Sequence, residues 1–107
     1  MKRVITFGTF DVFHIGHVNI LERAAQLGDY LIVGVSSDAL SFKKKQRYPL
    51  YSQDDRVKII SALRCVDEVF IEESLEDKAR YIEMKNADLL VMGDDWEGRF
   101  DWRSEER

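Results

Sequence analysis

The two histidines of this 107-residue chain lie three positions apart, in the tetrapeptide HIGH. An apolar run precedes His14 and a helical pattern follows His17, so the pair is expected at a strand-to-helix turn. Gly16 allows the backbone to approach a ligand closely, and the N-terminus of a helix presents unpaired amides with a partial positive charge. Two imidazoles that point to one side of this turn add further donors. This combination indicates a phosphate site.

Phosphoryl transfer is the chemistry that such a site would serve. A phosphoryl group under attack gathers negative charge on its equatorial oxygens, and imidazole donors stabilise that charge without forming a covalent bond. Two alternatives remain open for His14 and His17. A zinc pair would need three or four protein ligands, but the chain has no third histidine and only one cysteine, Cys65. Histidines that merely pack would not require the glycine or the position at a turn.

The hydrophobic pattern predicts which elements position this turn. Short apolar, β-branched runs predict four strands, at residues 3–7, 30–36, 66–71 and 88–93. Helical patterns lie between them, at residues 16–28 with Gly28 as a glycine cap, at 52 to about 63 and at 74 to about 85, the last two opened by capping boxes at Ser52 with Asp55 and at Ser74 with Asp77. This alternation predicts an α/β fold, a Rossmann-like doubly wound parallel sheet with helices on both faces, in one domain over residues 1–107.

Three unusual segments then meet at the carboxyl edge of the sheet, where parallel sheets bind their ligands. They are GTFDVFHIGH after the first strand, SSDALSFKKKQR after the second and GDDWEGRFDW after the fourth. We expect Lys43, Lys44 and Lys45 on a flexible loop, whose cations screen anionic ligands and close over them. A solvated surface is the other interpretation of such a lysine run. The edge is therefore predicted to bind anions.

Composition limits the remaining possibilities. Hydrophobic residues make up 45% of the chain and charged residues 34%, as in a globular domain. The net charge of -4 gives no reason to expect nucleic acid as a partner. No apolar run approaches the roughly 20 residues of a membrane span, and the first residues lack a signal-peptide pattern, so we expect a cytoplasmic protein without membrane insertion. Cys65 is expected to pack near a helix-to-strand junction.

Several segments together resemble the cytidylyltransferases of the HIGH-motif nucleotidyltransferase superfamily. The tetrapeptide GTFD before the histidines and the pattern RxVDEV, here RCVDEV, narrow the resemblance to this family, and MGDDWEGRFD resembles its glycerol 3-phosphate branch. The resemblance implies transfer of CMP from CTP to glycerol 3-phosphate, giving CDP-glycerol and pyrophosphate, with Mg²⁺ carried by the CTP and with homodimers as the common assembly. A different phosphorylated acceptor, or ATP in place of CTP, is the alternative within the superfamily.

The resemblance also implies roles for individual residues. His14, His17 and Asp11 would be catalytic, with the histidines holding phosphates and Asp11 organising the turn or contacting the phosphate network. Nucleotide contacts fall on Gly8, Thr9, Phe10, His14, His17, Arg56, Arg64 and Asp94. Acceptor contacts fall on Lys43, Lys44, Lys45 and Lys78, and no residue is expected to be a metal ligand. Because the acceptor phosphate is itself an anionic nucleophile, no general base is expected.

Two departures from the family pattern lead to further expectations. Where the glycerol phosphate branch has a tryptophan, this chain has Ser74 and Leu75, so the acceptor pocket is expected to differ. The family continues past FDW into a further strand and an RTxGISTT-like segment, whereas these 107 residues end in FDWRSEER. We therefore expect an open strand edge that favours self-association, and a catalytically impaired nucleotide-binding form as the alternative to an active enzyme.

Overall fold

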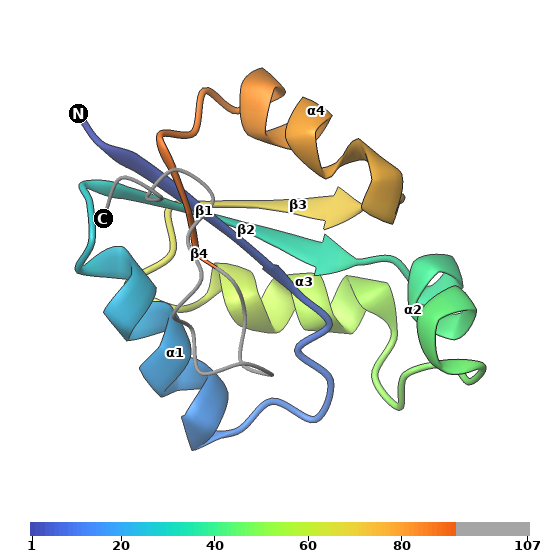
Figure 1. Ribbon diagram of the computed structural model, residues 1–107. Helices are drawn as coiled ribbons and strands as arrows, with labels where there is room; N and C mark the ends of the chain where they lie inside the picture. Colours follow the sequence, from blue (N-terminus) through green and yellow to red (C-terminus); the bar gives the residue numbers. More distant parts are fainter. Residues whose placement is uncertain (92–107) are drawn as a thin grey trace.

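The computed structural model describes residues 1–91 as one parallel sheet covered by helices (Figure 1). Its elements are β1 (Arg3–Gly8), α1 (Ile15–Ala25), β2 (Tyr30–Ser36), α2 (Asp38–Lys45), α3 (Gln53–Ser61), β3 (Glu68–Glu72), the 3₁₀ turn η1 (Leu75–Asp77), α4 (Lys78–Met84) and β4 (Leu89–Val91). The strand order is β3-β2-β1-β4, and every neighbouring pair is parallel. The predicted parallel α/β sheet is confirmed, with β1 at the position where the strand order reverses.

Two apolar layers bury the two faces of the sheet, because side chains alternate between faces along each strand. One layer joins α1 and α3 to the sheet through Val4, Leu21, Leu31, Val33, Val35 and Ile60. The other joins α4 to the sheet through Ile5, Phe7, Ile32, Ile82 and Leu90. Figure 1 shows α1 and α3 below the sheet and α4 above it. The doubly wound arrangement is therefore confirmed, and it leaves the carboxyl edge to the connecting loops and α2.

Strand boundaries agree closely with the prediction. β2 spans the predicted residues, and β1 is one residue longer at its carboxyl end. β3 begins at Glu68 rather than Val66, because the carboxylate of Asp67 accepts the amide of Leu31 at 2.8 Å and so takes the place of a ladder bond. β4 falls within the predicted range, whose last residues lie outside the described part of the chain.

Helix ends agree with the prediction at one position and differ at two. Ser52 caps α3 as predicted, since its hydroxyl accepts the amide of Asp55 at 3.2 Å. The glycine cap at Gly28 is wrong, because α1 ends at Ala25; a Cβ at Gly28 would lie 2.8 Å from the carbonyl oxygen of Lys2, so the glycine serves close packing. The capping box at Ser74 is also wrong: its hydroxyl bonds the Glu76 carboxylate, and a 3₁₀ turn precedes α4.

The lysine run, predicted as a flexible loop, is the end of helix α2. Ser37 caps this helix by accepting the amide of Leu40 at 3.0 Å, and Gln46 ends it in the left-handed conformation with φ 63°. The loop prediction is therefore wrong. Lysines in the last turn complement the negative end of the helix dipole, which favours the observed helix.

Cys65 packs, partly buried, against the side of the core formed by α1 and α3. Burial raises the pKa of its thiol, with a further contribution from the negative charge of Glu22. Both features favour the neutral thiol. The predicted role as a packed residue is confirmed.

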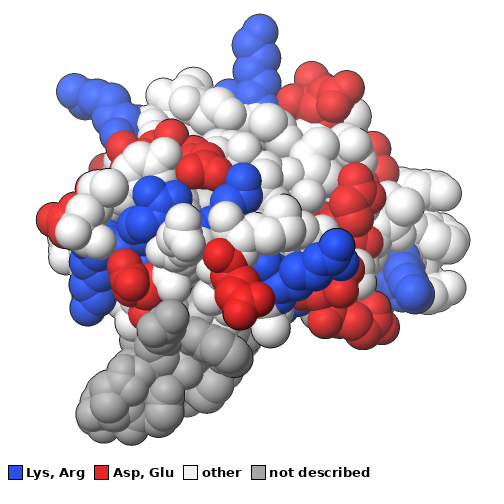
Figure 2. All heavy atoms as spheres, turned by 90° about the horizontal axis from the view of Figure 1, so that it is seen from above, with Lys and Arg blue, Asp and Glu red and all other residues white. Residues whose placement is uncertain are grey.

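The surface on the α4 side carries charges of both signs. Figure 2 shows this side, where Lys and Arg are interspersed with Asp and Glu and neither sign forms a continuous patch. Within residues 1–91, no helix is long and apolar enough to cross a membrane.

An ion network joins the elements at the amino edge of the sheet. The carboxylate of Glu68 pairs with Lys85 at 2.8 Å, accepts the hydroxyl of Tyr30 at 3.2 Å and lies 3.8 Å from Arg3. The hydrogen bond from Lys85 lowers the pKa of Glu68; partial burial opposes it, but the Lys85 charge, Tyr30 and Arg3 keep the pKa below its ordinary value of 4.5. Ionised Glu68 therefore stabilises the fold above that pH, and the stabilisation is lost as pH falls through the lowered pKa.

Glu68→Gln should remove this contribution. We expect the free energy of unfolding at pH 7, measured with urea, to fall by about 0.5–1 kcal/mol, and the decline of stability below pH 4.5 to become shallower. Glu83→Gln, at an exposed position of α4, is the matched control and should change neither quantity. An unaltered pH profile in Glu68→Gln contradicts the assignment.

Candidate functional site

The turn after β1 carries two residues in the left-handed region, Phe10 with φ 55° and Val12 with φ 47°. Non-glycine residues rarely adopt this conformation, so surrounding contacts must hold it. Asp11, between them, supplies such contacts: its carboxylate oxygens accept the amides of Leu50 and Tyr51, each at 2.8 Å. The turn is thereby fixed to the segment that leads into α3.

Asp11 is ionised at neutral pH. Partial burial raises the pKa of its carboxyl, but amide hydrogen bonds from Tyr51 and Leu50, together with the charge of Arg56, lower it more. The net pKa lies below its ordinary value of 3.8. These bonds give Asp11 the first of its two predicted roles, organisation of the turn. Its contact with a substrate stays a prediction.

His14 opens α1 as its N-cap residue. Its Nδ1 accepts the amide of Gly16 at 3.0 Å, and its own amide donates to Nδ1 of His17 at 3.2 Å, which completes a capping box built from two imidazoles. Gly16 makes this possible, because a Cβ there would lie 2.7 Å from Cε1 of His14. The glycine of HIGH therefore makes room for the ring of His14.

His17 is the buried member of the pair. It stacks on Phe13 with 5.2 Å between ring centroids and meets Phe10 edge-on at 5.6 Å. The rings of His14 and His17 lie 4.1 Å apart. Aromatic neighbours and capping bonds restrict both side chains, so the imidazoles are positioned by the protein itself.

The capping bonds also determine which ring nitrogen carries the proton. In each histidine Nδ1 accepts a backbone amide, so the neutral ring must hold its hydrogen on Nε2. Both Nε2 atoms are then donors, as the stabilisation of phosphate oxygens requires. The pair stands at the first turn of α1, where backbone amides also favour an anion. This arrangement can bind a phosphate and stabilise charge that develops on it.

Arg56, in α3, is fully buried beneath the carboxyl edge. Its Nε donates to the carbonyl of Tyr51 at 2.9 Å, and Nη1 donates to the carbonyls of Thr9 at 2.9 Å and Ser36 at 2.8 Å. Nη2 pairs with Asp38 at 2.7 Å. One guanidinium thus joins the ends of β1 and β2 to the starts of α2 and α3. The nucleotide contact predicted for this arginine stays a prediction.

Among the three lysines of α2, Lys44 reaches the end of a strand. Its Nζ donates to the hydroxyl of Ser36, the last residue of β2, at 3.1 Å. Lys43 and Lys45 are exposed in the same helical turn. All three lysines are exposed, and the structure brings the ammonium of Lys44 to the carboxyl edge.

Lys78, the first residue of α4, stands beside the end of β3. Its Nζ pairs with Glu72 at 2.6 Å and lies 4.2 Å from the ring centroid of Phe7. Lys44 and Lys78 thus occupy neighbouring strand ends, and their contact with an acceptor stays a prediction. Sequence reasoning missed Glu72, although an acidic residue at the end of an apolar strand was a usable signal.

The remaining predicted contacts divide between the two edges of the sheet. Gly8, Thr9 and Phe10 lie at the carboxyl end of β1 and in its turn. Arg64 lies between α3 and β3, at the amino edge, because α3 runs back along the sheet from the opposite edge. The structure therefore does not bring Arg64 to the histidines. Asp94 lies outside the described residues.

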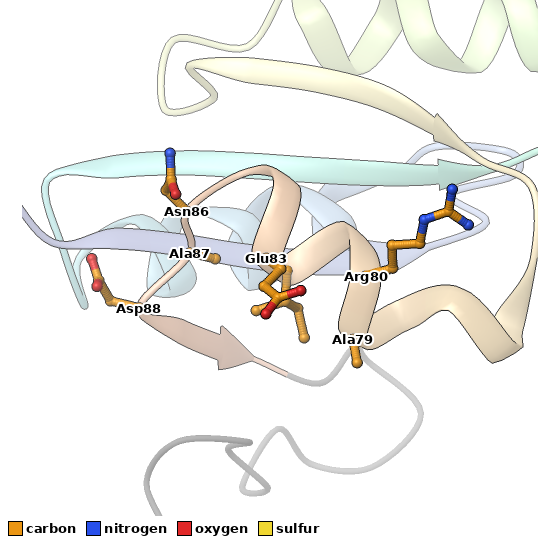
Figure 3. Close-up of a pocket in the computed structure, with 7 residues that line it drawn as sticks. Ala79, Arg80, Glu83, Asn86, Ala87 and Asp88 are labelled. Atoms are coloured by element: carbon orange, nitrogen blue, oxygen red, sulfur yellow. The ribbon is translucent and has the colours of Figure 1, made fainter.

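A hollow of about 610 Å³ lies away from this edge, along the flank of α4 and beside the start of β4 (Figure 3). It is lined by Ala79, Arg80, Ile82, Glu83, Asn86, Ala87 and Asp88. None of these is a predicted site residue, and Figure 3 shows its ionisable side chains standing apart rather than converging. The hollow is therefore distinct from the candidate phosphate site.

The chain matches known proteins over nearly its whole length. A family profile described as Cytidylyltransferase-like matches residues 5–106. The chain is 50% identical over 102 residues to a glycerol-3-phosphate cytidylyltransferase of Bacillus subtilis (strain 168), covering 95% of this chain and 78% of that protein. It is 38% identical over 102 residues to an FAD synthase of Pyrococcus abyssi (strain GE5 / Orsay), covering 95% of this chain and 68% of that protein.

A solved structure shares the fold. The crystal structure of the lipopolysaccharide core biosynthesis protein from Thermoplasma volcanium GSS1 matches with a TM-score of 0.81 and 29% sequence identity, covering 94% of this chain and 80% of that one. The matched fold includes the sheet whose carboxyl edge holds the histidine turn.

The substitution Arg56→Lys tests whether the hydrogen bonds of the buried guanidinium stabilise the fold. Lysine keeps the positive charge but lacks the planar fork, so it cannot serve the carbonyls of Thr9, Ser36 and Tyr51 together. Because each charge-assisted hydrogen bond is worth about 1.5–3 kcal/mol, we expect the free energy of unfolding in urea to fall by about 3 kcal/mol. Arg80→Lys, at an exposed position of α4, should change it by less than about 0.5 kcal/mol. Equal stability of the Arg56→Lys protein and its parent would show that these hydrogen bonds do not stabilise the fold.

Proposed function

Because the chain belongs to the cytidylyltransferase-like family, we propose that it is a nucleotidyltransferase that transfers CMP from CTP to glycerol 3-phosphate, giving CDP-glycerol and pyrophosphate. One observation carries this proposal: two imidazoles, held in a capping box at the start of α1, stand at the carboxyl edge of a parallel sheet. The name of the 50% identical Bacillus subtilis relative supports the choice of nucleotide and acceptor.

The proposed reaction needs positioning more than proton transfer. An oxygen of the acceptor phosphate attacks the α-phosphorus of CTP, the bond from that phosphorus to the bridging oxygen breaks, and pyrophosphate leaves. The acceptor phosphate is already anionic near neutral pH, so no general base is required. His14 and His17 donate their Nε2 hydrogens to phosphate oxygens, where they stabilise the charge that develops during the transfer.

The turn after β1 is proposed to hold the nucleotide. The backbone of Gly8, Thr9 and Phe10 meets the triphosphate, and Asp11 maintains the conformation of this turn through its bonds to the segment before α3. Asp94 is proposed to recognise the base. This division leaves the histidines to act on the phosphates alone.

Mg²⁺ is proposed to enter with CTP as part of the nucleotide substrate. Within residues 1–91, no three His, Cys, Asp or Glu side chains gather in a way that could hold a metal ion. Triphosphate oxygens, in contrast, bind Mg²⁺ well and leave it few positions for protein ligands. The need for CTP also supports the cytoplasmic location that we propose.

The acceptor is proposed to bind beside the ends of β2 and β3. Lys44 and Lys78 place two ammonium groups there, which offset the repulsion between the acceptor phosphate and the triphosphate. Lys43 and Lys45 add positive charge at the surface of the same helix. The two ammonium groups at the strand ends are proposed to supply the charge that two anionic substrates require at the carboxyl edge.

A second candidate keeps the same site but changes a substrate. The FAD synthase relative and the presence of Leu75, where the glycerol phosphate branch carries tryptophan, favour another phosphorylated acceptor or ATP as the nucleotide. Pyrophosphate release with four nucleoside triphosphates and several phosphorylated alcohols separates the candidates. CTP with glycerol 3-phosphate should give the highest turnover, and a clear preference for another pair would replace our first choice.

His17→Ala should reduce turnover far more than stability. Loss of one transition-state donor typically costs about a hundredfold or more in rate, whereas His17 contributes to stability one ring packed against Phe13 and Phe10 and one capping bond to α1, which is typically worth about 1 kcal/mol. The comparison is kcat for CTP and glycerol 3-phosphate, with urea unfolding of the same preparation. Asn19→Ala, an exposed position in α1, is the matched control and should retain full turnover. Normal kcat in His17→Ala would remove the histidine from the mechanism.

We propose that the protein acts as a homodimer. Ile15 is 70% exposed and Leu50 81% exposed, and Val12 and Tyr48 add further exposed apolar surface. The bond between Asp11 and the amide of Leu50 fixes these segments to one another, so they form one surface next to the turn. Exposed apolar side chains on neighbouring segments are typical of a contact with another protein, here a second copy of the chain.

Leu50→Glu should dissociate the proposed dimer, because a carboxylate in an apolar contact loses its hydration without a partner. Sedimentation equilibrium should give a dimer for the parent and a monomer for Leu50→Glu. Leu27→Glu, at an exposed position beyond the other end of α1, should leave the dimer intact. A monomeric parent, or a Leu50→Glu protein that remains dimeric, contradicts this interface.

A further inference from the structure

Glu72 is a buried carboxylate that the proposed mechanism does not use. It is the last residue of β3, and its side chain is only 1% exposed. A carboxylate in the interior costs several kcal/mol unless it is paired. Its partner is Lys78, with 2.6 Å between Oε2 and Nζ. Because a buried ion pair adds little net stability, the presence of this pair at the end of a strand suggests a further role.

The ammonium of Lys78 is held on two sides. Glu72 accepts one of its three hydrogens, and the face of Phe7 lies 4.2 Å from Nζ on the neighbouring part of the sheet. The side chain of Lys78 is 28% exposed, so the charged group is fixed in the protein yet still accessible from solvent. A lysine held in this way loses less conformational entropy when it binds an anion than a free surface lysine does.

The backbone places this pair next to Lys44. Ser36 and Glu72 are register partners in the β2–β3 ladder, and the amide of Ser37 donates to the carbonyl of Glu72 at 2.9 Å. Because Lys44 bonds Ser36 and Lys78 bonds Glu72, the two ammonium groups stand on adjacent strand ends. The buried carboxylate of Glu72 lies behind the ammonium of Lys78.

We propose that Glu72 is a positioning residue, which holds the ammonium of Lys78 against Phe7 so that its remaining hydrogens meet the phosphate of the acceptor. This inference rests on the proposed function of Lys78 in acceptor binding. Glu72 acts through Lys78 and does not touch the substrate. Its negative charge opposes the binding of an anion, but the fixed position of the ammonium outweighs this effect.

Steady-state kinetics of Glu72→Gln test the proposal. Glutamine preserves the shape but is a weaker acceptor, so Lys78 is released. We expect KM for glycerol 3-phosphate to rise about tenfold, with kcat and KM for CTP within about twofold of the parent, as for loss of ground-state binding. An acceptor KM that is unchanged or lower overturns the proposal. Glu72→Asp keeps the charge but moves it one methylene away from Lys78, and it should raise the same KM. This variant provides the test if Glu72→Gln folds poorly.

The chain itself offers a matched control. Glu68 also lies in β3 and also pairs with a lysine of the α4 segment, Lys85, at 2.8 Å, but at the amino edge. Glu68→Gln breaks a pair of the same chemistry and should leave the KM of both substrates unchanged. Equal kinetic effects in Glu68→Gln and Glu72→Gln would mean that only stability is involved, and would overturn the proposal.

An NMR measurement separates this inference from the proposed function. In protein labelled with ¹⁵N-lysine, the Lys78 ammonium should give a resolved signal, because its bond to Glu72 slows proton exchange; Glu72→Gln should lose that signal. Added glycerol 3-phosphate should shift the signal in the parent. If the parent binds glycerol 3-phosphate in this way but does not turn it over with CTP, the proposed reaction fails and the positioning role stands. If the signal survives in Glu72→Gln, the positioning role fails whatever the turnover.

Discussion

A guanidinium without solvent contact lies beneath the carboxyl edge, where Arg56 donates to the carbonyls of Thr9, Ser36 and Tyr51 and pairs with Asp38. Burial of a charge is costly, and the planar fork offsets the cost by satisfying several acceptors at once. These acceptors belong to different elements. The ends of two strands and the starts of two helices therefore cannot move independently of one another.

The turn that carries the histidines depends on the Arg56 hydrogen bonds through Tyr51. Asp11 accepts the amide of that residue, and Arg56 binds its carbonyl, so the segment before α3 is held from both sides. That segment in turn supports Phe10 in its left-handed conformation. The imidazoles that follow are fixed by their own capping bonds. The fold itself thus holds these groups in place, as the proposed catalysis without a general base requires.

Sequence reasoning predicts what depends on local pattern. The apolar run of β2 and the serine cap of α3 were both recoverable, because each signal lies within a few residues. The role of Gly28 could not be predicted, because glycine is needed there for close packing against the carbonyl of Lys2, which belongs to another segment. Nor could the sequence show that Arg56 is buried, because its four acceptors come together only in the folded chain.

The same limit applies to the site. The residues of HIGH alone predict a phosphate site, but the capping bonds that set the tautomer of both rings are visible only in three dimensions. The lysine run shows a cation-rich segment without showing that it is helical or that Lys44 alone bonds a strand end. The resemblance predicts a nucleotide contact for Arg64, whereas the order of the elements places this residue between α3 and β3, away from the histidines.

In the proposed reaction, the acceptor phosphate attacks the α-phosphorus of CTP at this edge. The most direct measurement uses glycerol 3-phosphate labelled with ¹⁸O in its phosphate, with MgCTP and the purified protein, and follows the label by ³¹P NMR. All of the label should appear in CDP-glycerol, with an equal amount of unlabelled pyrophosphate and no product in the absence of acceptor. Label in the pyrophosphate, or release of CMP without CDP-glycerol, would contradict this reaction.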